Sequence, residues 1–246
     1  MSALDRIVVR LRRELGDRVQ TDVPLREHTT YRVGGPAAVL TRVDEISELD
    51  ALAVALADEE VDVLPLGRGS NLVVSDRGFP GVVIHLGPRF ASLAGEGPTL
   101  IAGGAAPMPQ VANRAARRGL AGMEFAIAIP GSVGGGVRMN AGAHGGEVGD
   151  HLSSIRLFDL GDRRVVERSG GELGFSYRRS NLTDHHLVLD ARWTLPSDDP
   201  AAIKQRTEAN RRHRAETQPG AVQNAGSVFK NPPGDHAGRL VELAGL

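Results

Sequence analysis

The chain has 246 residues, which is enough for one or two domains with a sizeable core. Apolar residues make up 41% of it and 31 residues are glycine, so a disordered polyampholyte is excluded. With 29 basic and 30 acidic side chains the net charge is -1, which excludes a global positive field for nucleic acid or an anionic membrane, and the absence of cysteine excludes disulfides and thiolate chemistry.

Hydrophobic periodicity predicts the elements of the first third of the chain. It indicates a helix over 4–15, a strand over 37–43, a helix over 46–60 that Asp44 could cap, and a strand over 61–66. Short strands are expected over 72–74 and 81–86. This order contains a β-α-β unit.

The rest of the chain alternates between strands and glycine-rich segments. A strand over 99–102 and a helix over 107–118, ended by Gly119, precede short helices joined by turns over 119–149. Strands over 155–159, 164–167 and 187–195 suit an antiparallel sheet, and a charged helix follows over 200–217. A last helix begins near Asp235, which could cap it.

These elements predict an α+β fold in three parts. We expect an N-terminal α/β lobe over 1–86, a second lobe over 87–196 and a third piece over 197–246. The start of the chain has no apolar stretch after a basic segment, and no run reaches the roughly 18 apolar residues of a membrane helix. We therefore expect a cytoplasmic protein without a membrane or nucleic-acid partner.

One turn combines groups that bind anions. Gly67, Arg68, Gly69, Ser70 and Asn71 follow a predicted strand and offer two glycines, a cation, a hydroxyl and an amide. Glycines expose successive backbone N–H groups, which can surround an anion. An ordinary hairpin turn explains the same residues equally well.

A second cluster is richer in glycine. Residues 129–136 read Ile-Pro-Gly-Ser-Val-Gly-Gly-Gly, and Asn140 opens a further glycine-rich run. Three consecutive glycines oppose helix formation, so the run favours a backbone lying against a ligand, with Ser132 able to meet a phosphate. A flexible linker is the alternative, although apolar residues interleave these glycines.

Two further segments carry polar side chains suited to catalysis. Residues 174–181 contain Tyr177 and Arg178, and an arginine can grip a carboxylate with two hydrogen bonds, although an exposed loop is the simpler explanation. Residues 225–232 place Ser227 near Lys230, where a turn with a polar cap explains the pattern as well. Neither G-x-G-x-x-G nor a P-loop occurs, so we expect no standard Rossmann or P-loop site, and the absence of G-x-S-x-G argues against a serine hydrolase. The histidines show no H-E-x-x-H spacing, so we expect no metal site.

Together these segments resemble one family. The chain is similar to the UDP-N-acetylenolpyruvoylglucosamine reductases (MurB) of peptidoglycan synthesis, and the matches occur in the same order along the chain. They lie at residues 29–35, 66–71, 122–125, 129–135, 139–143, 175–178 and 226–232.

The resemblance implies a two-lobed FAD-binding fold of the PCMH/VAO type, followed by a partial α+β substrate-binding domain. It implies that NADPH reduces FAD and that hydride then passes to the enolpyruvyl ether of a UDP-sugar. We expect the protein to be a monomer. The implied cofactor residues are Tyr31, Gly67, Arg68, Gly69, Ser70, Asn71, Gly131, Ser132, Val133, Gly134 and Asn140. Arg178 and Ser227 are implied as catalytic, and Tyr177, Lys230 and Asn231 as substrate-binding.

One departure from the family concerns the third piece. The family carries a further segment with a catalytic Glu, whereas residues 241–246 read Val-Glu-Leu-Ala-Gly-Leu, so we expect a truncated substrate domain and uncertain activity. Two alternatives stay open at this point. One is another FAD-dependent oxidase of the same fold, and the other is a truncated chain that binds flavin only.

Overall fold

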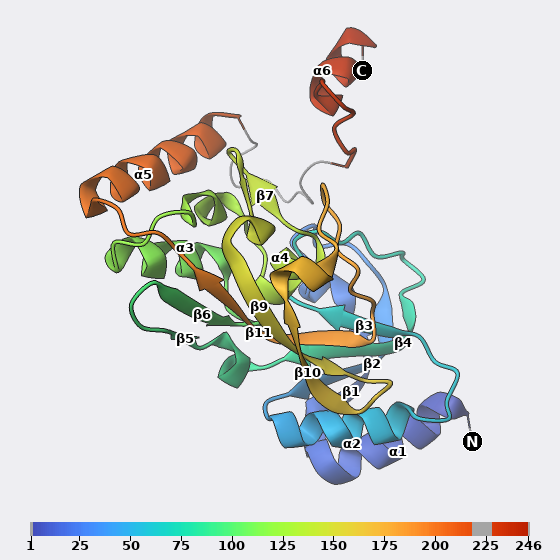
Figure 1. Cartoon of the computed structure of the whole chain (residues 1–246). Helices are drawn as coiled ribbons and strands as arrows, with labels where there is room; N and C mark the ends of the chain where they lie inside the picture. Colours follow the sequence, from blue (N-terminus) through green and yellow to red (C-terminus); the bar gives the residue numbers. More distant parts are fainter. Residues whose placement is uncertain (1, 218–227, 246) are drawn as a thin grey trace.

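The computed structural model describes residues 2–217 and 228–245 (Figure 1). Its first sheet has the strand order β1-β2-β4-β3, in which β4 lies parallel to both β2 and β3 while β1 is antiparallel to β2. The strands are β1 (Val19–Pro24), β2 (Pro36–Val43), β3 (Val63–Leu66) and β4 (Phe79–Leu86). The helices α1 (Ala3–Leu15) and α2 (Ile46–Leu56) pack against this sheet.

The ends of these two helices follow from local hydrogen bonds. Ser2 and Asp5 form a capping box at the start of α1, which buries Ile7, Leu11 and Leu15 on one face. The helix α2 ends at Leu56, four residues before the predicted end. Its N-cap is Glu45, so the expectation that Asp44 caps it is wrong; the Asp44 carboxylate instead pairs with Arg18.

The second sheet is entirely antiparallel, with the order β10-β9-β11-β6-β5. Its strands are β5 (Leu93–Ala94), β6 (Thr99–Gly103), β9 (Leu152–Asp159), β10 (Arg164–Ser169) and β11 (His186–Thr194). The helices α3 (Met108–Arg117) and α4 (Val133–Arg138) pack with it, and β7 (Gly142–Ala143) and β8 (Gly146–Glu147) form a separate hairpin. The chain continues into α5 (Pro200–Thr217) and α6 (Ala237–Leu243).

Short 3-10 helices join these elements. They are η1 (Gly16–Arg18), η2 (Leu25–Glu27), η3 (Pro88–Ala91), η4 (Glu124–Ala128), η5 (Val148–His151) and η6 (Gly170–Leu173). The helix α5 contacts η4 and α3, so it returns to the second sheet's side of the molecule (Figure 1). In the described ranges, no helix combines the length and the apolarity that crossing a membrane requires.

The α+β class and most predicted elements are confirmed, and two further local expectations are wrong. Residues 72–74 form no strand; Val74 lies against Gly34, and the Gly35 N–H donates to Ser75 O, so this segment pairs with an irregular loop. Asp235 does not cap α6, because the Ala237 N–H donates to the side chain of Asn231.

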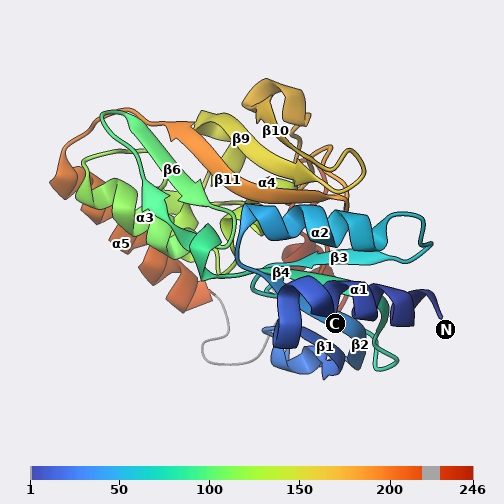
Figure 2. The ribbon, with the colours of Figure 1, turned by 90° about the horizontal axis from the view of Figure 1, so that it is seen from below.

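Three apolar cores separate the layers of the fold. One lies between the second sheet and the α3–α4 side, and a smaller one covers the outer face of the first sheet around Leu25 and Val83. The third is shared, because α1, α2 and strands β2 and β4 bury apolar side chains together with Phe158 and Leu189 of the second sheet. Figure 2 shows α1, α2 and the first sheet below strands β9, β10 and β11. The two sheets are therefore joined by common packing, and the expected division at 86, 196 and 246 stays a prediction.

Candidate functional site

A cavity of about 440 Å³ and one of about 600 Å³ occur in the described chain, and the larger lies where the two sheets meet. Leu66, Ile84 and His85 line it from the first sheet, and Leu187 and Val188 line it from β11. Its volume falls within the range of roughly 300–1,000 Å³ that is typical of small-molecule and cofactor sites. The position at the junction of the two sheets is also one that such sites favour.

The glycine turn after β3 forms one wall of this cavity. Gly67 and Arg68 line it. Within the described residues, no backbone N–H from Gly67 to Asn71 donates to a protein acceptor. Such consecutive unpaired donors can hold an anion, and the predicted anion-binding turn therefore has the donors that it requires.

The second glycine cluster lies directly against this turn. A Cβ on Gly67 would come within 2.3 Å of Ser132 Oγ, and a Cβ on Gly131 would be 3.3 Å from Ser70 Oγ. Arg68 Nε donates to Pro130 O over 3.1 Å. Two segments that are more than sixty residues apart in the sequence thus form one continuous surface beside the cavity.

The N–H groups of the second cluster are divided between two uses. Those of Gly131 and Ser132 donate to no acceptor in the described chain, so they resemble the donors of the turn. Val133 and Gly134 instead donate to Ala106 O and Gly104 O, and the N–H of the next residue donates to Ser132 Oγ. The N–H groups of Val133 and Gly134 thus join α4 to the 104–106 loop, whereas those of Gly131 and Ser132 are unpaired within the described residues.

Electrostatics at the cavity favour an anionic ligand. Arg42, Arg68 and Arg138 line it, and Asp184 is the one carboxylate among the lining residues. Arg138 pairs with Asp184 at 2.9 Å and Arg42 with Asp44 at 3.2 Å. Arg68 has no carboxylate partner among the described residues, so its charge remains available beside the unpaired N–H groups.

Sequence reasoning missed several polar residues of the cavity, namely Arg42, His85, Gln110, Arg138 and His186. A signal existed for the first two, since Arg42 and His85 are neighbours in the parallel register of β2 and β4, and both are polar within apolar strands. Burial, the largest cause, together with His28 and Arg42, lowers the pKa of His85. His85 is therefore neutral near pH 7.

His186 is held in one orientation. Its Nδ1 accepts a hydrogen bond from the Thr183 N–H at 2.9 Å, and its Nε2 lies 3.3 Å from Arg168 Nη2 and 3.4 Å from Asp159 Oδ2. Burial lowers the pKa of His186, and the nearby Arg168 acts in the same direction. The imidazole thus contributes a neutral, fixed wall to the cavity.

Tyr31 does not line the cavity, but its neighbours support the glycine turn. Thr30 N donates to Gly69 O over 3.0 Å, and a Cβ on Gly69 would lie 2.1 Å from His28 O. Gly69 also has φ +60°, a conformation that side chains disfavour. Glycine is required here for two independent reasons, and Tyr31 itself is partly exposed.

Arg178 lies at the tip of a tight turn between η6 and β11. Ser176 and Arg179 exchange both backbone hydrogen bonds across this turn, and Arg178 has φ +56°. A guanidinium nitrogen (Nη2) donates to Gly142 O at 2.6 Å, and the group lies 4.9 Å from the centre of the Tyr177 ring. Unusual backbone conformations of this kind concentrate at functional sites.

The remaining predicted residues are distributed differently. Asn140 is fully buried and does not line the cavity; its side chain bonds within the protein to Gly149 and Ser176. Lys230 and Asn231 are exposed, and Asn231 caps α6. Ser227 lies outside the described residues. No described hydrogen bond or ion pair connects Tyr177 or Arg178 with Lys230 or Asn231.

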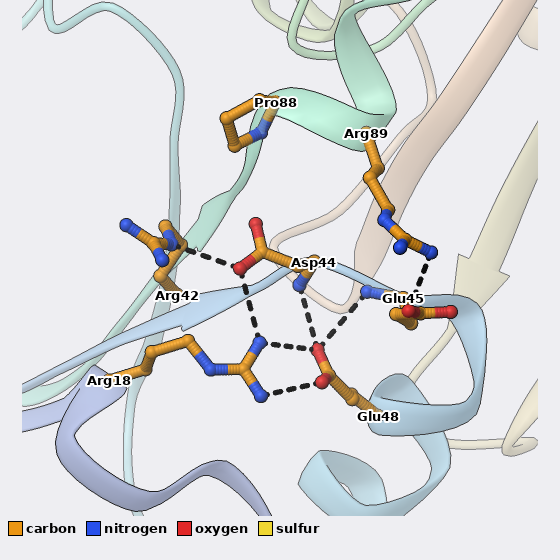
Figure 3. Close-up of a pocket in the computed structure, with 7 residues that line it drawn as sticks. All are labelled: Arg18, Arg42, Asp44, Glu45, Glu48, Pro88 and Arg89. Atoms are coloured by element: carbon orange, nitrogen blue, oxygen red, sulfur yellow. Dashed lines mark hydrogen bonds and ion pairs between the residues drawn. The ribbon is translucent and has the colours of Figure 1, made fainter.

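The smaller cavity is an open pocket walled by charges that pair with one another (Figure 3). Arg18 binds Glu48 through both guanidinium Nη atoms, at 2.6 and 2.9 Å, and Arg89 pairs with Glu45 at 2.6 Å. The Arg18 hydrogen bond is the largest cause that lowers the pKa of Glu48 to about 2. The Arg18–Glu48 pair joins η1 to α2, whereas Asp44 Oδ1 is buried without a hydrogen-bond partner among the described residues. The described residues hold no group of three His, Cys, Asp or Glu suited to a metal ion.

Comparison with known proteins defines the class of this site. The family model "FAD binding domain" matches residues 36–169, which include β2–β4, the glycine turn and the α4 segment. The structure of p-cresol methylhydroxylase is similar in fold alone, with a TM-score of 0.57, 12% identity, and coverage of 80% of this chain and 44% of that one. The fold is therefore that of an FAD-binding domain.

Closer relatives define the family. The UDP-N-acetylenolpyruvoylglucosamine reductase 2 of Symbiobacterium thermophilum is 45% identical over 230 residues, which cover 93% of this chain and 74% of the relative. The crystal structure of the MurB reductase from Thermus caldophilus matches with a TM-score of 0.82 and 38% identity, covering 93% of this chain and 80% of that one. The chain belongs to the UDP-N-acetylenolpyruvoylglucosamine reductase (MurB) family.

Proposed function

We propose that this chain catalyses the FAD-dependent reduction of UDP-N-acetylglucosamine enolpyruvate to UDP-N-acetylmuramate with NADPH, in peptidoglycan precursor synthesis. The observation that carries this proposal is the meeting of the Gly67–Asn71 turn with the Gly131–Ser132 segment beside one cavity. These residues fit a dinucleotide pyrophosphate, because both segments offer unpaired N–H groups and Arg68 adds an available cation. Identity to the reductases over most of the chain supports the choice of substrate.

The flavin would be held by residues from both lobes. The N–H groups of Gly67–Asn71, Gly131 and Ser132 and the guanidinium of Arg68 would bind the pyrophosphate, and the apolar wall around Ile84 and Val188 would cover uncharged parts. Bound FAD supplies hydride transfer from NADPH to the substrate. Val133 and Gly134 support this site through their backbone bonds to Ala106 O and Gly104 O, and Tyr31 would lie close to the flavin.

Arg178 is assigned the electrostatic role in reduction of the enolpyruvyl group. Addition of hydride at C3 leaves negative charge at C2, which spreads into the adjacent carboxylate. A guanidinium can bind that carboxylate through two hydrogen bonds, and it stabilises the charge as it develops. Stacking on Tyr177 and the bond to Gly142 O already hold the Arg178 side chain in a defined position.

Ser227 is assigned the proton transfer that completes the reduction. Its hydroxyl would donate a proton to C2, and Lys230 would stabilise the resulting serine oxyanion or the substrate pyrophosphate. Tyr177 and Asn231 would contact the substrate. The family relationship and the segment 226–232 support these roles.

The amino-acid composition supports a proposal for the cellular compartment and for the kinds of partner. We propose a cytoplasmic monomer that binds the UDP-sugar and NADPH and has no membrane or nucleic-acid partner. A chain without cysteine suits a reducing compartment, and balanced charge gives no field for polyanions.

A spectroscopic experiment tests the proposal. The purified chain should take up FAD and turn yellow, NADPH should bleach it without oxygen, and UDP-N-acetylglucosamine enolpyruvate should restore the colour. A protein that takes up no added FAD contradicts the proposal. Rapid reoxidation by oxygen with indifference to the UDP-sugar indicates an oxidase, and flavin retention without UDP-sugar turnover indicates a chain that binds cofactor only.

A further inference from the structure

Asn140 occupies a junction between three segments. It lies two residues after the end of α4, is fully buried, and has φ +40°, a conformation that asparagine tolerates better than most residues. Its Oδ1 accepts a hydrogen bond from the Gly149 N–H at 3.0 Å, and its Nδ2 donates to Ser176 O at 3.2 Å. Both ends of the amide are therefore used inside the protein.

The segment around Asn140 holds the Arg178 turn at several points. Ser176 O, the acceptor of Asn140 Nδ2, is also the carbonyl that closes the turn by accepting from the Arg179 N–H. Two residues beyond Asn140, Gly142 O accepts from the Arg178 guanidinium. Two residues before it, Arg138 O accepts from Ser180 Oγ at 2.7 Å. The turn is thus fixed by residues 138–142.

The same segment begins in the cavity wall. Ser132, Gly134 and Arg138 line the cavity, and Asn140 follows them after one intervening residue. A short, continuous piece of chain therefore links the wall of the cavity to the turn that carries Arg178. We propose that Asn140 is a positioning residue: its buried amide fixes the backbone of the Ser176–Arg179 turn so that the Arg178 guanidinium is held for the substrate carboxylate.

This inference rests on the proposed role of Arg178 and replaces the expected contact between Asn140 and the flavin. Two substitutions distinguish the roles of the oxygen and the nitrogen of the Asn140 side chain. Asn140→Asp keeps the oxygen that accepts from Gly149, but an ionised carboxylate cannot donate to Ser176 O. Asn140→Gly removes the side chain and retains a residue that accepts a positive φ.

We expect both variants to bind FAD and to be bleached by NADPH as the unsubstituted chain is. Reoxidation by the UDP-sugar should slow by roughly tenfold or more, because small displacements of a catalytic group are costly. For Asn140→Asp the rate should recover as the pH falls, since the protonated carboxyl can donate again, and Asn140→Gly should show no such recovery. Asn181→Asp is the matched control, because Asn181 Nδ2 also donates to a backbone carbonyl, Glu172 O, but at an exposed position.

A second readout does not depend on turnover. Trypsin cleaves after arginine, so cleavage after Arg178 and Arg179, followed by mass spectrometry, reports how firmly the turn is held; it should accelerate in Asn140→Gly and stay unchanged in Asn181→Asp. Unchanged reoxidation and cleavage in both Asn140 variants would overturn the inference, as would a loss of FAD binding with unchanged cleavage. If Arg178→Ala alone reoxidises normally, the role of Arg178 fails, whereas the cleavage result still decides whether Asn140 holds the turn.

Discussion

Gly67 and Ser132 are in contact across the wall of the cavity, so that a Cβ on Gly67 would lie 2.3 Å from Ser132 Oγ and 3.4 Å from Ser132 Cβ. The hydroxyl is therefore the only part of Ser132 that excludes a larger residue at position 67. That hydroxyl also accepts from the Gly135 N–H as the N-cap of α4. The two residues should consequently be energetically coupled.

A double-mutant cycle measures this coupling. Gly67→Ala should weaken FAD binding by about tenfold, because the Ser132 hydroxyl must move and the turn shifts with it. Ser132→Ala removes the cap and should cost about 1 kcal/mol of unfolding free energy. In the double variant the clash is absent, so FAD should bind at least as well as in Gly67→Ala alone. Flavin fluorescence titration measures the affinity, and Gly171→Ala, in open space, is the control. Additive losses of affinity would contradict the coupling.

Arg178→Lys separates charge from geometry at the proposed catalytic turn. Lysine keeps the positive charge but cannot bind a carboxylate through a planar pair of donors, so reoxidation of the flavin by the UDP-sugar should slow by about 10²–10³-fold. Bleaching by NADPH should be unchanged. Stopped-flow absorbance resolves the two half-reactions. Arg179→Lys, at the exposed neighbouring position, should leave both rates as they are; an equal effect at the two positions would refute the specific role.

Glu48 should make the unfolding free energy depend on pH in the acidic range. The Arg18 hydrogen bond is the main cause that lowers its pKa in the folded chain from 4.5 to about 2, so the folded state binds this proton more weakly than the unfolded state does. The stabilisation is complete above the unfolded pKa and is lost as the pH falls from about 5 towards 2. Glu48→Gln should lower the unfolding free energy at pH 7 by about 1 kcal/mol, because partial solvent exposure weakens the pair.

Urea unfolding at pH 7 and pH 3 checks the result for Glu48. The difference between Glu48→Gln and the unsubstituted chain should shrink at the lower pH, where the carboxylate of the unsubstituted chain begins to protonate. Glu208→Gln is a suitable control, since the Lys204–Glu208 pair is exposed and 3.9 Å long. A difference that is the same at both pH values would show that lost packing, rather than charge, explains the effect.

The buried His85 should make the stability of the fold depend on pH in a second range. Because burial lowers its pKa in the folded state, the unfolded chain binds a proton more readily as the pH drops through the ordinary histidine range. This contribution to stability is present above the unfolded pKa of about 6.5 and declines as the pH falls below it. His85→Gln should flatten the decline between about pH 7 and pH 5 in thermal melts of the FAD-free chain. His185→Gln, at an exposed position, is the control; an unchanged slope in His85→Gln would contradict the expectation.

The fold was largely predictable because its elements carry strong local patterns. The Ile7, Leu11 and Leu15 stripe defines α1, and the apolar run at Val82–Ile84 marks a strand that is buried on both faces. The strand expected over 72–74 failed because its partner is the irregular loop at Gly34–Gly35, and no local pattern reports such long-range backbone pairing. The expectation that Asp44 caps α2 is wrong because Arg18, which binds the Asp44 carboxylate, is distant in the sequence.

The sequence predicted which segments form the candidate site, but not which hydrogen bonds each residue makes there. Glycine content identified both segments that meet beside the cavity, yet only hydrogen-bond partners distinguish the unpaired N–H of Ser132 from that of Gly134, which binds Gly104 O. Asn140 illustrates the same limit, since an asparagine in a glycine-rich motif fits either a ligand contact or an internal bond. The contact between the two glycine-rich segments beside the cavity depends on tertiary structure, so no local pattern in the sequence predicts it.

The core that the two sheets share has a consequence for how the molecule melts. Phe158 and Leu189 from one sheet and Val39 and Ile84 from the other are buried in the same apolar cluster, so neither half can expose its interior without exposing part of the other. Calorimetry of the FAD-free chain should accordingly show these two halves unfolding in one cooperative heat-absorption peak. Ligand binding at their junction should move that whole peak to higher temperature instead of splitting it.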